Sequence, residues 1–289
     1  MSAAVEPWRA LYPFEPRVFT HPDGTRQSYV DVGTGDPVLM LHGNPTWSFY
    51  YRNLVTGLGA TRRAIAIDHV GCGLSDKPAG ADYRLAGHVE RAERLVTALG
   101  LERITLVVHD WGGPIGFGVA QRDLSRIARI VVLNTAAFLV PRCPWRIRAC
   151  RVPGLGPLMV RGANAFVRGL TRMASVKPLP SAVRAGYLYP YDSWAHRIAV
   201  SRFVSDIPLA PTHPSYATLR AIEDGLAAMR AIPMLILWGM RDWCFSPDFL
   251  EGWRQRFPDA EVHAWDDAHH LVLEDAPDRA LAAIERFVA

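Results

Sequence analysis

The chain has 289 residues, of which 49% are hydrophobic, and its formal net charge is +4. This length and composition favour one main domain with a large core. No stretch approaches the roughly 18 uninterrupted apolar residues of a membrane span, and residues 1–16 contain the acidic Glu6 and no apolar signal core. We therefore expect neither a membrane-spanning helix nor a secretion signal, and we predict a soluble, cytoplasmic protein.

Strand-like apolar runs recur along the chain and alternate with helical stretches. Residues 17–31 predict an antiparallel hairpin that turns at Asp23 and Gly24. The apolar runs that follow lie at 37–41, 64–67, 104–108, 130–133, 234–238 and 261–264. Apolar residues recur at helical spacing in 82–99 and 271–288. Strands that alternate with helices predict an α/β protein, with a mostly parallel central sheet covered by helices on both faces.

The alternation stops in residues 138–211, which contain several Pro, Gly and Trp but no convincing strand. Such a length is too great for a structureless loop in a compact domain. We therefore predict an inserted helical cap over 138–211 that divides the α/β core into 1–137 and 212–289. Because ligands in open α/β sheets bind outside the carboxyl ends of the strands, this cap would cover the binding site.

The predicted cap is strongly basic. Residues 140–210 contain ten arginines and Lys177 against Asp192 and Asp206, which gives this segment a charge of +9 and leaves −5 for the rest of the chain. Such an excess is expected on solvated helix faces, and equally on a surface that meets an anionic membrane, partner protein or acyl-carrier group. Both interpretations stay open at the level of sequence.

The cysteines predict free thiols. They stand at positions 72, 143, 150 and 244, which is not the spacing of metal ligands. In a chain of this length without a secretion signal, cysteines usually stay reduced. We therefore expect no disulfide and no metal site, and the sequence implies no organic cofactor.

Three predicted strands end in side chains suited to chemistry. Asp110 follows the run 104–108 and precedes Gly112 and Gly113, which predict a tight turn into a helix. Asp242 follows the run 234–238, and His270 follows the last run. The order nucleophile, acid, histidine matches the α/β-hydrolase arrangement, with aspartate where many such enzymes have serine.

Neighbouring residues leave alternatives for two of these positions. The strand before Asp242 ends in the neutral Asn134, which cannot serve as the acid. The spacing from His270 to Glu274, four residues on, favours His270 as the histidine. The competing residues are Asp248, Asp266 and Asp267 for the acid and His269 for the histidine.

Several motifs carry a resemblance to a known family. The haloalkane dehalogenase group of α/β-hydrolases is similar in HDWGG (109–113), HGNPTWS (42–48), DHVGCGLSDKP (68–78) and the positions of the acid and the histidine. The β-lactone decarboxylases of bacterial long-chain olefin biosynthesis, which are built on that frame, are similar in LNTAAF (133–138), YPYDSWAHRIAVSRFVSDIPL (189–209) and VLEDAP (272–277). The resemblance extends from residue 11 almost to the C-terminus and includes the predicted cap.

The resemblance implies roles for five residues. Asp110 would be the nucleophile, because a carboxylate can form an ester with substrate carbon whose carbonyl belongs to the enzyme. His270 would activate water, and Asp242 would orient its ring and stabilise its charge. The side chains of Asn44 and Trp111 would donate N–H groups to an outgoing anion, and their backbone N–H groups would form an oxyanion hole. Plain packing is the alternative for Trp111, and His109 is expected to pack beneath the turn.

The activity implied is the decarboxylation of cis-3-alkyl-4-alkyloxetan-2-ones, which are lipophilic β-lactones, to long-chain cis-alkenes and CO2. A haloalkane dehalogenase would use the same residues unchanged. An epoxide hydrolase would need cap tyrosines to protonate an alkoxide, which Tyr187, Tyr189 and Tyr191 would supply, but Asn44 argues against it because an N–H donor suits an anion that departs. A binding or scaffold protein on an inactive frame is disfavoured because all three triad residue types are present.

The resemblance also implies partners. We expect a complex with the β-lactone synthetase and the dehydrogenase of the same pathway, near a membrane that receives the oily product. The basic cap is the expected docking face for these partners or for peripheral membrane association. No nucleic-acid partner is expected.

Overall fold

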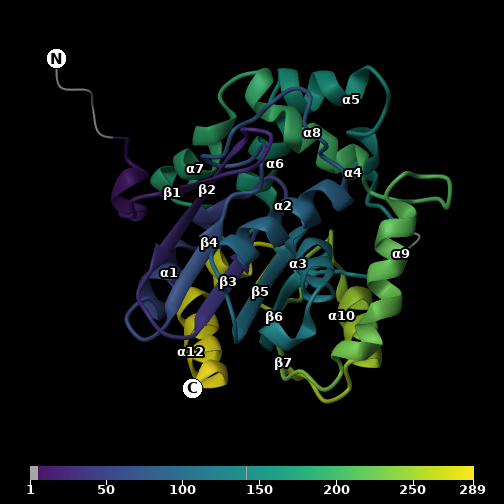
Figure 1. Cartoon of the computed structure of the whole chain (residues 1–289). Helices are drawn as coiled ribbons and strands as arrows, with labels where there is room; N and C mark the ends of the chain where they lie inside the picture. The colour runs from purple at the N-terminus through teal and green to yellow at the C-terminus, as the bar shows by residue number, and fades with distance from the viewer. Residues whose placement is uncertain (1–5, 141) are drawn as a thin grey trace.

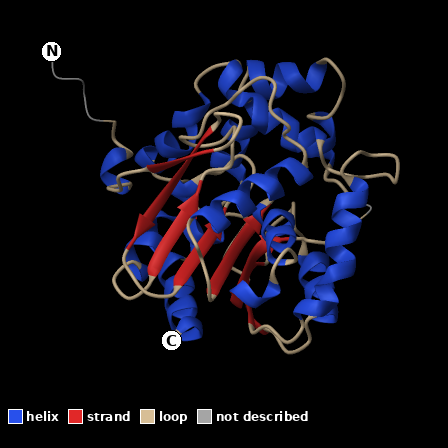
Figure 2. Ribbon diagram, viewed as in Figure 1, coloured by secondary structure: helices blue, strands red, loops and turns tan. Residues whose placement is uncertain are grey.

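The computed structural model describes residues 6–140 and 142–289, and its centre is one eight-stranded sheet (Figures 1 and 2). The strand order is β1-β2-β4-β3-β5-β6-β7-β8, in which β3 to β8 run parallel and β1 and β2 form an antiparallel edge. The strands are β1 (Arg17–Thr20), β2 (Arg26–Val32), β3 (Pro37–Leu41), β4 (Arg63–Ile67), β5 (Ile104–Asp110), β6 (Ile127–Thr135), β7 (Met234–Gly239) and β8 (Glu261–Trp265). The predicted hairpin and all six predicted parallel strands are confirmed.

The central parallel strands are mostly apolar because both faces of the sheet are buried there, whereas the edge strand β8 is partly exposed. Successive side chains of a strand point to opposite faces, so Leu39 and Leu41 of β3 join one core while Val38 and Met40 join the other. The first core lies under α2 (Leu85–Ala98), α3 (Gly112–Ala120), α9 (Tyr216–Gly225) and α10 (Pro247–Arg256). The second lies under α1 (Arg52–Leu58) and α12 (Pro277–Val288).

The helix predicted over 271–288 is two helices in the structure. The first is α11 (Val272–Asp275), and α12 begins directly after it at Pro277. Ala276 between them has φ −137° and ψ 50°, which is outside the helical range. The break follows from Pro277, because proline disfavours helical geometry in the residue before it and suits the first turn of a new helix.

A group of helices inserted between β6 and β7 lies beyond the carboxyl ends of the strands, at the top of Figure 1. They are α4 (Trp145–Ala149), α5 (Leu155–Pro157), α6 (Ala165–Met173), α7 (Ser181–Leu188) and α8 (Ile198–Ser205). These helices fall within residues 138–211 and have a small core of their own around Val160, Val167 and Val204. We call this helical group the cap.

The remaining helical turns are short. Six are 3₁₀ turns, at Arg9–Leu11, Ser48–Tyr51, Leu124–Arg126, Tyr189–Tyr191, Ala195–Arg197 and Leu226–Met229. A π-helical turn, Leu158–Gly162, follows α5. None of the helices in the described ranges has both the length and the apolar content needed to cross a bilayer.

Candidate active site

Asp110 lies at a strained turn between β5 and α3. Its φ of +50° is in the left-handed region, which aspartate tolerates better than most residues. A side chain at Gly112 would collide with the carbonyl of Leu41, and one at Gly113 would collide with Thr135, so this turn requires both glycines. The hydroxyl of Thr135 also donates to the backbone carbonyl of Asp110. The turn therefore fixes the carboxylate at the carboxyl edge of the sheet.

The carboxylate of Asp110 is surrounded by N–H donors. The backbone N–H of Asn44 donates to Oδ1 over 2.6 Å, and the backbone N–H of Trp111 also stabilises the charged form. Oδ2 lies 4.0 Å from Nε2 of His270. Burial raises the pKa of Asp110, while the charge of His270 and the two N–H groups oppose this rise. The backbone N–H groups of Asn44 and Trp111, which were predicted to form an oxyanion hole, thus both interact with the carboxylate of Asp110.

His270 and Asp242 form a buried pair behind Asp110. Nδ1 of His270 lies 2.8 Å from Oδ2 of Asp242, and Oδ1 of Asp242 accepts the N–H of Cys244 over 2.7 Å. Burial alone would lower the pKa of His270, but the charge of Asp242 and this hydrogen bond raise it above 6.5. Burial pushes the pKa of Asp242 upward, yet the charge of His270 keeps it below its usual value. The pair therefore favours an imidazolium whose Nε2 faces Asp110.

Asn134 is a site residue that the sequence reasoning set aside. Its Nδ2 donates to Oδ2 of Asp242 and to the carbonyl of Gly239, each over 3.1 Å, and its Oδ1 accepts the N–H of Gly239 over 2.8 Å. The neutral residue at the end of β6 therefore positions the acid that follows β7. Its place at a strand end beside the other site residues is the signal that would have revealed it.

The competing acids and the competing histidine do not face Asp110. His269 accepts the N–H of His270 at its own Nδ1, over 2.7 Å, and its backbone N–H donates to Asp275. Nε2 of His109 donates to the carbonyl of His270 over 3.0 Å, and the two rings lie 4.6 Å apart, so His109 packs beneath the turn. Asp248 pairs with Arg142 and Asp267 with Arg279, all on the surface. The geometry brings Asp110, His270 and Asp242 together and leaves the alternatives outside.

The side chains of Asn44 and Trp111 differ in their availability. Nδ2 of Asn44 donates to the carbonyl of Val200 in α8 over 3.2 Å, so one of its two N–H bonds ties the loop to the cap. The expectation that this amide donates to an outgoing anion can therefore apply only to its second N–H bond. The indole of Trp111 lines the cavity beside Phe203, with ring centroids 5.3 Å apart, and donates to no acceptor in the described ranges.

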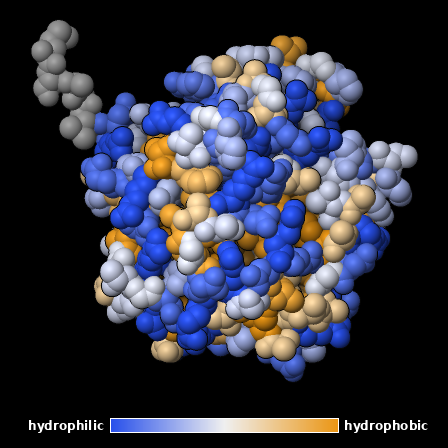
Figure 3. Space-filling model, viewed as in Figure 1, coloured by the Kyte–Doolittle hydropathy of each residue, from blue (hydrophilic) through white to orange (hydrophobic). Residues whose placement is uncertain are grey.

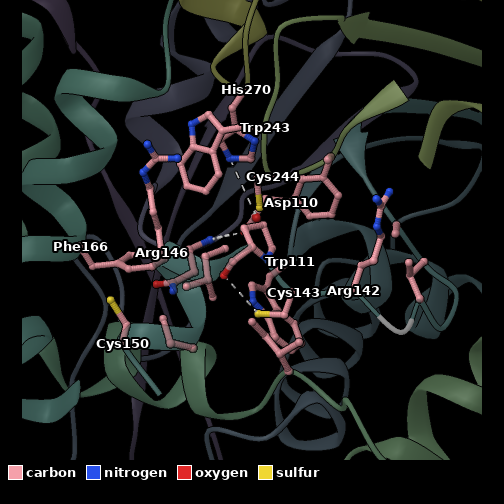
Figure 4. Close-up of a pocket in the computed structure, with 18 of the residues that line it drawn as sticks. Asp110, Trp111, Arg142, Cys143, Arg146, Cys150, Phe166, Trp243, Cys244 and His270 are labelled. Atoms are coloured by element: carbon pink, nitrogen blue, oxygen red, sulfur yellow. Dashed lines mark hydrogen bonds and ion pairs between the residues drawn. The ribbon is translucent and has the colours of Figure 1, made fainter. Parts of the chain in front are cut away.

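A cavity of about 430 Å³ extends from Asp110 and His270 beneath the cap (Figure 4). Most of its lining is apolar, including Leu139, Val140, Phe166, Leu170, Val204 and Phe245. The thiols of Cys143, Cys150 and Cys244 are free and also line it. Asp110 and His270 supply the reactive polar groups, and Arg142 and Arg146 also line the cavity, so it suits a largely lipophilic molecule that reacts at Asp110.

Three cap tyrosines are the residues that an epoxide hydrolase would need, and none of them lines this cavity in the described structure. Tyr187 donates its hydroxyl to Glu274, and Tyr191 donates to the carbonyl of Thr46 over 3.3 Å. Tyr189 packs against Trp8, with ring centroids 4.5 Å apart. None of the three hydroxyls is therefore placed to protonate an alkoxide at Asp110.

The sheet, the strained aspartate turn and the Asp-His pair define an α/β-hydrolase with a carboxylate in the nucleophile position. A family model described as alpha/beta hydrolase fold matches residues 36–277. A cis-3-alkyl-4-alkyloxetan-2-one decarboxylase of Shewanella oneidensis is 45% identical, over 96% of this chain and 89% of the relative. One of Xanthomonas campestris with the same name is 42% identical, over 96% of this chain and 97% of the relative.

More distant relatives carry another name. Haloalkane dehalogenase 2 of Mycobacterium tuberculosis is 37% identical over 99% of this chain and 100% of the relative. The crystal structure of the haloalkane dehalogenase DatA of Agrobacterium tumefaciens, at 23% identity, has a TM-score of 0.84 over 96% of this chain and 98% of that one, which shows the shared fold. The chain belongs to the α/β-hydrolase family, in the group that contains these decarboxylases and dehalogenases, and the resemblance drawn from the motifs is confirmed.

Proposed function

We propose that the protein decarboxylates cis-3-alkyl-4-alkyloxetan-2-ones to cis-alkenes and CO2, with Asp110 as the nucleophile and no cofactor. The observation that carries the proposal is a carboxylate at the end of an apolar cavity, 4.0 Å from an imidazole. A carboxylate can displace a leaving group from saturated carbon and then leave again, whereas serine would form a stable ether. The two decarboxylases that match almost the whole chain support this choice of substrate.

The first step opens the strained ring. An oxygen of Asp110 attacks C4, the ring carbon bonded to the ring oxygen, from the side opposite that bond. The C4–O bond breaks, an ester forms between C4 and Asp110, and the ring oxygen becomes part of a carboxylate attached to C3. The unpartnered indole N–H of Trp111 is the donor best placed to stabilise this new anion.

The second step releases both products without water. The bond between C3 and the carboxylate breaks, its electron pair forms the C3–C4 double bond, and the C4–O bond to Asp110 breaks. CO2 leaves, and Asp110 returns as a carboxylate. Backside attack places the ester opposite the C3 carboxylate, so fragmentation needs no rotation about C3–C4. Two alkyl groups that were cis on the ring therefore remain cis on the alkene.

His270 and Asp242 act in this route through their charges, which influence the ionisation of Asp110. The imidazolium favoured by Asp242 lies beside Asp110 and opposes the effect of burial on the nucleophile. It keeps the carboxylate ionised in a cavity that would otherwise favour the protonated acid. Water activation by His270 is not required, because the ester is removed by fragmentation.

Haloalkane dehalogenation is the second candidate. The dehalogenase of Mycobacterium tuberculosis supports it, and the same Asp110, His270 and Asp242 would perform it. That reaction requires a neutral His270, because the ester must be hydrolysed by an activated water. It also requires donors for a free halide, and in this structure one N–H of Asn44 is already bound to Val200.

A single-turnover reaction in ¹⁸O-labelled water tests the proposal. We expect a synthetic cis-β-lactone to give cis-alkene and CO2, with no label in the peptide that contains Asp110. Label in Asp110 would refute fragmentation and indicate hydrolysis of the enzyme ester. Halide release from 1-bromobutane without loss of the lactone would show that the activity is dehalogenation and not decarboxylation. Replacing Trp111 by phenylalanine should slow alkene formation by about 10² or more, because it removes one donor to the anion.

We also propose that the protein acts in the cytoplasm, in a complex with the β-lactone synthetase and the dehydrogenase of the same pathway. The four free cysteines support a reducing compartment. The family resemblance supports the complex. Co-elution of the three purified proteins would test it, and separate elution at physiological salt would count against it.

A further inference from the structure

The segment 142–173, which contains α4, α5 and α6, has an unusual composition. It holds seven arginines and no aspartate or glutamate. The described part of the chain has nine large apolar side chains that are exposed, and five of them lie in this segment: Trp145, Val152, Leu155, Leu158 and Met173. Trp145 is 70% exposed and Leu158 is 62% exposed, so water covers most of both side chains. In Figure 3 a few hydrophobic residues are exposed among hydrophilic ones at the top of the molecule, over the region of α5.

In the described structure, most arginines of this segment have no acidic partner, although Arg142 pairs with Asp248. Within the described ranges, no ion pair involves Arg146, Arg148, Arg168 or Arg172. The described core also contains arginines without ion pairs, but acids lie among its exposed arginines, as Asp82 does beside Arg84, whereas the segment itself contains no acid. Most of the positive charge of the segment is therefore uncompensated at the surface.

Direct contacts join α4 to both neighbours. Gly156 of α5 lies so close to the carbonyl of Cys150 at the end of α4 that a side chain there would collide. Trp243 bridges α4 and α6, because its indole donates to the carbonyl of Met173 over 3.4 Å and the guanidinium of Arg146 lies 5.4 Å from its ring. We call the exposed side chains of this unit the α4–α6 face: Trp145, Arg146, Arg148, Val152, Leu155, Leu158, Arg168, Arg172 and Met173.

The cavity opens within the α4–α6 face. Trp145, Arg146 and Met173 are exposed to solvent and also line the cavity. The inner face of α6 lines it through Phe166 and Leu170, while Arg168 and Arg172 of the same helix point outward. A lipophilic molecule that enters or leaves the cavity at these residues therefore crosses the surface where the exposed apolar side chains and unpaired arginines lie.

We propose that the α4–α6 face docks on an anionic lipid bilayer, with the cavity mouth against the membrane. Tryptophan and leucine side chains that project from a basic surface are the pattern of interfacial membrane binding. Exposed apolar side chains gain free energy when they leave water for the headgroup and acyl region, and arginines remain at the level of the anionic headgroups. Substrate then enters from the bilayer and alkene returns to it, a consequence that rests on the proposed function.

Apolar exposure favours a membrane over an acidic protein or carrier. Positive charge alone would bind any polyanion. A polyanion without an apolar surface gains no binding free energy from Leu155 and Leu158, which line no part of the cavity. Each leucine should contribute to bilayer binding because its side chain would be buried there. The effect of the leucines therefore separates the two kinds of partner.

Vesicle flotation of the full chain without substrate tests the docking. The probes are vesicles of equal parts phosphatidylglycerol and phosphatidylcholine, vesicles of phosphatidylcholine alone, and heparin resin as a lipid-free polyanion. We expect binding to the anionic vesicles that weakens with added salt. Leu155→Ser with Leu158→Ser should weaken it about tenfold or more. Arg168→Gln with Arg172→Gln should weaken it roughly 25-fold, at about fivefold per arginine.

Matched controls lie outside the α4–α6 face. Leu11→Ser with Val18→Ser removes two exposed apolar side chains, and Arg84→Gln with Arg103→Gln removes two exposed charges, all outside the cap. These variants should float like the parent chain. The Leu155 and Leu158 variant should retain turnover of a short, water-soluble β-lactone, which shows that the fold and the site are intact.

Each outcome decides the proposal. Absence of flotation overturns it, as does flotation that the leucine pair does not affect. Binding to heparin without binding to anionic vesicles assigns the face to an acidic partner and also overturns it. Flotation needs no substrate. A protein that floats as expected but does not consume β-lactones would therefore refute the proposed function without contradicting the proposed docking.

Discussion

Replacing Asp242 by asparagine turns one acceptor oxygen into an NH2 donor, which the surrounding donors cannot accommodate. Both carboxylate oxygens accept hydrogen bonds: Oδ2 from Asn134 and from Nδ1 of His270, and Oδ1 from the N–H of Cys244. An amide has one acceptor and one donor end. In either orientation its NH2 group faces another donor, so a buried N–H loses its acceptor or the imidazole must change tautomer.

The structure sets the size of the effect. A lost charge-assisted hydrogen bond costs about 1.5–3 kcal/mol, and a buried donor left without a partner costs about 1–3 kcal/mol more. The variant should therefore lose roughly 3–6 kcal/mol of unfolding free energy. Without the charge of Asp242, the imidazolium is no longer favoured, and Asp110 loses the charge that opposes burial. A comparable exchange in a Ser-His-Asp triad costs about 10⁴ in kcat, and we expect a loss of similar size.

Urea unfolding and the rate of β-lactone consumption measure the two effects. The matched control is Asp267→Asn, because Asp267 is an exposed acid close in sequence to His270 and pairs with Arg279 on the surface. The control should change unfolding free energy by less than about 1 kcal/mol and leave the rate unchanged. A rate for Asp242→Asn within tenfold of the parent, or an equal loss in both variants, would refute the role assigned to Asp242.

Three further predictions follow from the same geometry. Decarboxylation needs ionised Asp110 beside protonated His270, so its rate should fall both as pH drops through the raised pKa of Asp110 and as pH rises through the raised pKa of His270. Debromination needs neutral His270 and should appear only as pH rises through that second pKa, so parallel pH–rate profiles would show lactone loss without halide release between the two. Glu274→Gln leaves the charge of Arg52 buried and unpaired, so it should cost about 3–5 kcal/mol and lower Tm by roughly 10 °C in a thermal melt. Gly43→Ala places a methyl group against the carboxylate of Asp110 and should reduce alkene formation by about 10² or more, with near-native circular dichroism.

Specific results would contradict each of these. Superimposable pH profiles for the lactone and the bromoalkane would mean that His270 acts as a base in both reactions. The control for Glu274→Gln is Asp82→Asn, which breaks an exposed pair with Arg84 and should change Tm by only about 2 °C; equal losses would contradict the buried pair. Full activity in Gly43→Ala would mean that the observed position of Asp110 is not required.

The fold was predictable because its sheet leaves a simple signal. Parallel strands buried on both faces appear as short apolar runs, and Asp110, Asp242 and His270 follow three of them, so their meeting at one edge needed no knowledge of packing. The class of the fold and the resemblance are confirmed. Helix bounds were less accessible, because the pattern over 271–288 is periodic throughout and the break depends on Pro277 alone.

Contacts across long stretches of sequence were beyond sequence reasoning. The amide of Asn44 reaches Val200, 156 positions away, and this removes an N–H group that the motif made to look available. Asn134 was identified as a neutral residue in an acid position, but its support of Asp242 depends on how the loop after β7 folds back. Side-chain amides have both donors and an acceptor, so their partners follow from packing and not from residue type.

The charge state of the site connects the geometry with the choice between the two activities. Asp242 raises the pKa of His270 against the effect of burial, which favours the protonated ring beside Asp110, whereas a hydrolytic route would need the ring neutral. A reaction in which Asp110 attacks and later departs as a carboxylate gains from that neighbouring positive charge at both steps. The same residues that would serve a dehalogenase thus suit, through burial and one acid, the proposed fragmentation, which consumes no water.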